Sequence, residues 1–116
     1  MSKTLHDNIE VIESGYEYLL AYAAQGRDTD EGPGGSEART KLTGMLEAAG
    51  SIITDLSADD SEFGPVVTDD ARKARAAIAL VLAQEKISSE LVDNLNASIH
   101  LRALLTDLFL LSETLT

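Results

Sequence analysis

Apolar residues recur at alternating intervals of four and three positions in two long stretches of the chain, and this spacing constrains the fold more than any other feature. An α-helix has about 3.6 residues per turn, so residues spaced in this way lie on one face of a helix. The two series are Leu5, Ile9, Ile12, Tyr16, Leu19 and Ala23, and Ala38, Leu42, Met45, Ala49, Ile52 and Leu56. The pattern predicts amphipathic helices that bury these faces against other helices.

Two stretches rich in glycine, proline and acidic residues divide the helical pattern. They are GRDTDEGPGG at residues 26–35 and SADDSEFGP at residues 57–65. Serine and threonine are common at the residue before a helix, so we assign the later helix starts to Ser36, Thr68 and Ser88. The expected helices span residues 3–25, 37–57, 69–85 and 89–114. The alternative for the last two is one continuous helix.

These elements predict a single all-α domain over residues 1–116, folded as an antiparallel four-helix bundle. The alternative is a pair of long-helix hairpins completed by dimerisation. A chain of 116 residues can bury a core without covalent cross-links, and this one contains no cysteine. The predicted core consists of Ile9, Ile12, Tyr16, Leu19, Leu42, Met45, Ile52, Ile78, Leu82, Leu104 and Leu108.

The chain is strongly acidic, with a formal net charge of −11 at pH 7. Nucleic acids and anionic membranes bind basic surfaces, so we expect neither as a partner, whereas a basic protein fits an acidic surface. The first residues lack the apolar segment of a signal peptide, and no stretch approaches the roughly 18 consecutive apolar residues of a membrane span. We therefore expect a cytoplasmic protein.

Metal sites in four-helix bundles use Glu-x-x-His pairs that point into the core. The residues three positions before His6 and His100 are Lys3 and Ala97, so this chain lacks such pairs. The sequence therefore argues against a di-metal centre of this kind.

Two other acidic patterns are weaker candidates for metal binding. A row beside the apolar face of the first helix consists of His6, Glu10, Glu13 and Glu17. Its position predicts a solvated row rather than a metal site. The stretch 55–66 departs from an EF-hand loop, because Asp60 replaces the turn glycine and Val66 the bidentate glutamate. We expect no metal and no cofactor.

The sequence contains no set of residues typical of a catalytic site. It has no cysteine nucleophile and no Gly-x-Ser-x-Gly motif. The stretch GPGGSE at residues 32–37 lacks the Lys-Ser/Thr pair of a phosphate-binding loop, and we expect it to form a flexible turn. We expect the protein not to be an enzyme.

The segment SIHLRALLTDL around His100 resembles the phosphoacceptor helix of histidine kinases over about ten residues. The acidic residue that follows the histidine in that helix is missing here. Small phosphotransfer domains place lysine and glycine shortly after the histidine, where this chain has Ala103 and Leu104. The resemblance implies a possible phosphoacceptor at His100, and the alternative is an ordinary surface histidine.

The last predicted helix carries two apolar series on different sides. One contains Ala97, Leu101, Leu104, Leu108, Leu111 and Leu115, and the other contains Val92, Leu95, Ile99, Ala103 and Leu110. A helix in a monomeric bundle buries one such face, so the second needs another partner. We predict a homodimer whose interface includes Val92, Leu95, Ile99 and Leu110. In the alternative, neighbouring helices of the same chain cover both sides.

These features favour a non-catalytic protein-interaction module, such as a small acidic helical adaptor, a chaperone or an accessory or regulatory subunit of a larger assembly. One alternative is a histidine phosphotransfer bundle that uses His100. Another is an acidic inhibitor that mimics nucleic acid, which requires its carboxylates to form a regular array.

Overall fold

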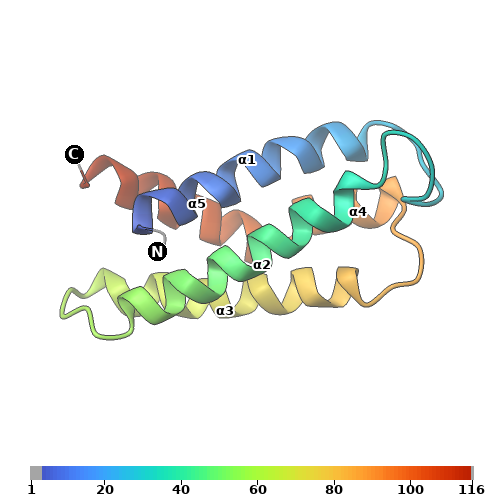
Figure 1. Cartoon of the computed structure of the whole chain (residues 1–116). Coiled ribbons are helices and arrows are strands. Elements are labelled where there is room, and N and C mark those ends of the chain that lie inside the picture. Colours follow the sequence, from blue (N-terminus) through green and yellow to red (C-terminus); the bar gives the residue numbers. More distant parts are fainter. Residues whose placement is uncertain (1–3, 116) are drawn as a thin grey trace.

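The computed structural model describes residues 4–115, and within this range all regular secondary structure is α-helical, with no strand. The helices are α1 Leu5–Ala23, α2 Glu37–Leu56, α3 Phe63–Leu82, α4 Ser89–Ala97 and α5 Ile99–Glu113. They form a helical bundle about 45 Å long (Figure 1). None of these helices is both long enough and apolar enough to cross a membrane.

The first three helices pack mainly against their neighbours along the chain, whereas the last two pack mainly against helices that are not their neighbours in sequence. α2 lies between α1 and α3, while α4 packs on α1 and α5 packs chiefly on α3 (Figure 1). The loop between α1 and α2 and the link between α3 and α4 lie at one end of the bundle. The loop between α2 and α3 lies at the other end, with the start of α1 and the end of α5.

The apolar series of the first two helices form the core as expected. Every residue of the α2 series is buried, and in α1 the side chains of Ile9, Ile12 and Leu19 are buried. All predicted core residues are buried except Tyr16 and Leu82, which are half-buried. The predicted first helix also included residue 3, which lies outside the described residues.

The predicted start of the third helix is wrong, because α3 begins at Phe63 rather than after Thr68. Pro65 occupies the third position of this helix, where a backbone N–H has no acceptor within the helix. Proline is therefore compatible with the first turn. Thr68 is buried inside α3, and its hydroxyl donates a hydrogen bond to the carbonyl oxygen of Pro65 at 3.1 Å.

The predicted fourth helix is also wrong in one respect, because it is divided at Ser98 into α4 and α5. Ser98 has an extended backbone (φ −63°, ψ 140°), and its hydroxyl accepts a hydrogen bond from the N–H of Leu101. Ser98 therefore caps the first turn of α5, and α4 does not continue through it. Ser88 precedes α4 as predicted, and its hydroxyl accepts from the N–H of Leu91 at 3.0 Å.

The alternative of one continuous helix after residue 69 is wrong, since residues 83–88 form a non-helical link. Ser36 directly precedes α2 as predicted, but its side chain makes no capping hydrogen bond. Thr4 does cap α1, through reciprocal hydrogen bonds with Asp7.

Candidate functional site

The outward-facing side of α5 is the most apolar exposed part of the described helices. Ile99, Phe109 and Leu110 are 74%, 54% and 59% exposed, and we call these three residues the α5 outer face. A shallow hollow beside Ile99 is lined by Ala97, Ile99, Arg102, Ala103 and Thr106. The opposite side of α5 buries Leu101, Leu104, Leu105 and Leu108.

The structure separates the four residues predicted to form the interface. Ile99 and Leu110 belong to the α5 outer face, whereas Val92 and Leu95 are buried within the bundle. The extended backbone at Ser98 changes the direction of the chain, so the residues before and after it do not form one continuous stripe. Val92 and Leu95 are therefore core residues of α4.

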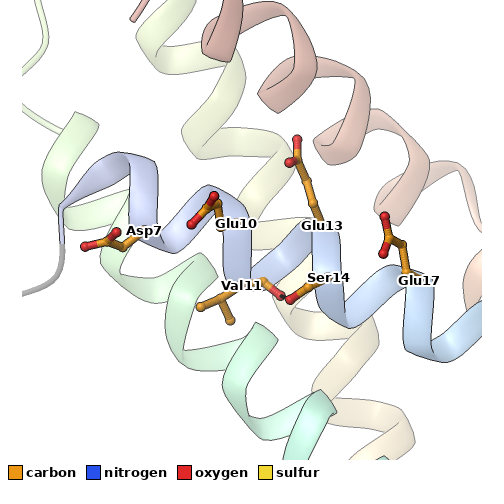
Figure 2. Close-up of a pocket in the computed structure, with 6 residues that line it drawn as sticks. All are labelled: Asp7, Glu10, Val11, Glu13, Ser14 and Glu17. Atoms are coloured by element: carbon orange, nitrogen blue, oxygen red, sulfur yellow. Dashed lines mark hydrogen bonds between the residues drawn. The ribbon is translucent and has the colours of Figure 1, made fainter.

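The acidic row predicted on α1 lies on the surface of that helix. Asp7, Glu10, Val11, Glu13, Ser14 and Glu17 line a shallow groove there, and their carboxylates point in different directions (Figure 2). The His6 Nε2 atom is 3.7 Å from a carboxylate oxygen of Glu10, and both side chains are exposed. Within residues 4–115, no three or more His, Asp or Glu side chains are grouped so as to hold a metal ion.

His100 lies in the first turn of α5 and is exposed. A phosphodonor could therefore reach the imidazole. The role of His100 as a phosphoacceptor stays a prediction.

A buried pair of carboxyl groups joins α5 to α3, and sequence reasoning missed it. Asp107 of α5 is only 8% exposed, and it forms a hydrogen bond with Asp70 of α3. Burial, this hydrogen bond and the negative charge of Asp70 raise the pKa of Asp107 to about 7. The Oδ2 atom of Asp107 is buried and has no other hydrogen-bond partner. We call Asp70 and Asp107 the carboxyl pair.

A second polar group, at the other end of α3, is fully paired. The two carboxylate oxygens of Asp30 accept hydrogen bonds from the N–H of Ile87 at 3.0 Å and from Arg39 Nε at 2.8 Å. Burial alone would raise the pKa of Asp30, but these two hydrogen bonds outweigh it and the pKa is lowered. Arg39 also donates to the carbonyl oxygens of Leu82, Gln84 and Glu85, where α3 ends.

Hydrogen bonds from α1 and α4 extend this group across the end of the bundle. The Ser89 hydroxyl donates to the carbonyl of Tyr22 at 2.7 Å and accepts from the N–H of Arg27 at 2.8 Å. The Tyr22 hydroxyl donates to the carbonyl of Ile87 at 2.7 Å. We call Tyr22, Arg27, Asp30, Arg39 and Ser89 the end cluster. Its bonds hold the loop between α1 and α2 and the link between α3 and α4 in place.

The loop predicted to be a flexible turn is also tied together by Arg27. Its guanidinium donates to the carbonyl oxygens of Thr29, Glu31 and Pro33. Gly35 packs closely here, because a Cβ atom at this position would lie 2.6 Å from the Asp30 carbonyl oxygen. The glycines of this loop therefore permit close packing around an arginine.

No family model, curated protein or solved structure that was compared with the chain matches it. Roles for individual residues therefore come from the geometry of this chain alone. The α5 outer face is exposed apolar surface, and the carboxyl pair contains a buried oxygen atom without a hydrogen-bond partner.

Proposed function

We propose that this protein is a non-catalytic interaction module, an acidic helical adaptor, chaperone or accessory subunit, that pairs with a second copy of itself through the α5 outer face. In this proposal α4 and α5 together take the place of the fourth helix in an antiparallel four-helix bundle. The observation that carries the proposal is the exposure of Ile99, Phe109 and Leu110 on a helix whose other side is already buried.

The three side chains are spaced to form one surface. Ile99 and Leu110 are eleven positions apart, which corresponds to about three helical turns, so they lie on the same side of α5. Phe109 is the neighbour of Leu110 and widens the surface at one end. Soluble monomers seldom leave large contiguous apolar patches in water, so such a surface favours an interaction.

A second copy suits this surface because two-fold symmetry makes one patch complementary to itself. An antiparallel crossing of two α5 helices lets Ile99 of one copy meet Leu110 of the other, and the reverse contact follows from the symmetry. Arg102 and Thr106 are exposed between Ile99 and Leu110 on the same side of α5, so the proposed contact would include polar as well as apolar side chains.

Sedimentation equilibrium of the wild type and of Ile99→Glu tests this proposal. We expect the wild type to be a dimer at micromolar concentration and Ile99→Glu to be a monomer, because a charge would be buried in the contact. Ile99 is highly exposed, so circular dichroism should show an unchanged helical content. The matched control is Leu20→Glu on α1, where the side chain is 48% exposed, and it should sediment like the wild type.

A wild type that stays monomeric at high micromolar concentration would refute self-association. A dimer that persists equally in Ile99→Glu and in the control would place the contact elsewhere on the protein. In either case the α5 outer face would not be the site of pairing.

A further inference from the structure

The carboxyl pair places two acidic groups in contact between two packed helices. Asp107 lies on α5 between the buried Leu105 and Leu108, and Asp70 lies half-buried on α3. An ionised carboxylate only accepts hydrogen bonds, so two of them in contact repel each other unless one holds a proton. The Oδ2 atom of Asp107 is buried without a hydrogen-bond partner, and the ion pairs within residues 4–115 involve neither Asp70 nor Asp107.

The other ionisable groups on the helices packed against α5 are engaged elsewhere or exposed. On α3, the Lys73 ammonium lies 3.2 Å from the carboxylate of Asp69, which precedes Asp70. The remaining acidic and basic groups on the helices around Asp107 are His6, Asp7, Glu10, Glu13 and Glu17 of α1, Glu90 and Asp93 of α4, Arg72 and Arg75 of α3, and His100, Arg102 and Glu113 of α5. All of these are exposed except Glu13, which is half-buried. Among the described residues, Asp70 is the only charged group that shifts the pKa of Asp107.

We propose that the carboxyl pair is a pH-sensitive contact, in which one shared proton holds the C-terminal half of α5 against α3 and loss of that proton releases it. In the protonated state, the O–H of Asp107 donates to the carboxylate of Asp70. When the proton passes to solvent, two negative charges face each other and one of them is poorly solvated. Residues 105–113 then separate from α3 until water reaches Asp107.

The expected size of the effect follows from the two proton equilibria of Asp107. In the closed state the pKa of Asp107 is about 7, and in a solvated open state it returns to the ordinary aspartate value of 3.8. Linkage then predicts that the opening equilibrium increases on the order of 30-fold between about pH 5.5 and about pH 8.5. Amide groups in the C-terminal half of α5 should lose protection by the same factor.

Hydrogen exchange measured by mass spectrometry on the full chain tests this proposal. Rates at each pH are divided by the intrinsic rate at that pH, which gives protection factors for peptides from α5 and from α2. We expect protection in residues 105–113 to fall on the order of 30-fold over this pH range, while protection in α2 stays constant. The experiment is done in the Ile99→Glu variant, at a concentration where this variant is monomeric. Its result then does not depend on self-association.

Two substitutions separate the carboxyl pair from other causes. Asp107→Asn cannot ionise and its amide can still donate to Asp70, so it should keep α5 protected at both pH values. Asp69→Asn removes a neighbouring exposed carboxylate and should retain the full pH dependence of the wild type. Protection that is independent of pH in the wild type, or equally dependent in Asp107→Asn, would overturn the proposal.

Carbon-13 NMR of the aspartate carboxyl groups provides a second measurement that needs no variant to fold. We expect one carboxyl resonance, that of Asp107, to titrate near pH 7. If every aspartate in the wild type titrates below about pH 5, the shared proton does not exist and the proposal is wrong.

Discussion

The global stability of the protein should decrease as the pH rises from acidic to neutral values, and Asp107→Asn should remove this decrease. The folded state raises the pKa of Asp107 from 3.8 to about 7, so between these values it holds a proton that the unfolded state has lost. The contribution of Asp107 to stability is therefore complete below about pH 3.8 and is lost as the pH rises to about 7.

The magnitude follows from the same two values. Each tenfold change in the proton equilibrium is worth about 1.4 kcal/mol, so the loss above pH 7 approaches about 4 kcal/mol. This is an upper limit, because release of α5 would let water reach the carboxylate before the whole bundle unfolds. Asp107→Asn should therefore be more stable than the wild type at pH 8 by about 1 to 4 kcal/mol.

Urea denaturation followed by circular dichroism at pH 5 and pH 8 measures this difference. The relevant quantity is the change in unfolding free energy between wild type and Asp107→Asn at each pH, because other carboxylates contribute equally to both proteins. A difference that is the same at both pH values would refute the reasoning, since the ionisation of Asp107 would then have no effect on folding.

Four further outcomes are expected. Leu42→Ala should lower the unfolding free energy by about 2–5 kcal/mol in urea denaturation, because Leu42 is fully buried, and a loss below about half a kcal/mol would contradict its place in the core. Ser98→Ala should cost about 1 kcal/mol in the same assay, whereas Ser36→Ala should cost little, since only Ser98 makes a capping hydrogen bond. Asp30 has the opposite effect to Asp107: because its pKa is lowered in the folded state, it stabilises the fold above the ordinary aspartate pKa, and this stabilisation is lost on acidification. In Asp30→Asn the unfolding free energy measured with urea should therefore fall less steeply as the pH is lowered. EDTA should leave the melting temperature in calorimetry unchanged, and a reproducible decrease would point back to the acidic row on α1.

The helices and most of the core could be predicted because their signals are local. The series from Ala38 to Leu56 needs only the period of a helix, and every member is buried. The start at Ser88 follows from the ability of its side chain to cap the first turn, which the structure confirms. Neither inference requires knowledge of which helices are neighbours.

The predicted helix boundaries are wrong where a local sequence signal is compatible with two different structures. Pro65 was read as part of a linker, but proline is also accepted in the first turn of a helix, and α3 uses it there. Ser98 was read as one helical residue among many apolar ones, yet its hydroxyl caps a new helix. Because of that break, Val92 and Leu95 face the core although Ile99 and Leu110 face water.

The carboxyl pair required information that the sequence does not contain. Asp107 is one acidic residue in a run of leucines, and it belongs to neither of the two apolar series of the last predicted helix. Its burial depends on the relative position of α3 and α5, which brings Asp70 to the same level. The available signal was an acid with leucines on both sides and an adjacent pair of aspartates on another helix, but their pairing follows only from the packed structure.

The end cluster also determines how the bundle can move. Its hydrogen bonds join residues 57 to 67 positions apart in the sequence, so α1, α4 and both connections are fastened together at that end. The loop between α2 and α3 and the end of α5 lie at the opposite end (Figure 1). Opening of the molecule should therefore begin there, with the end cluster as the hinge.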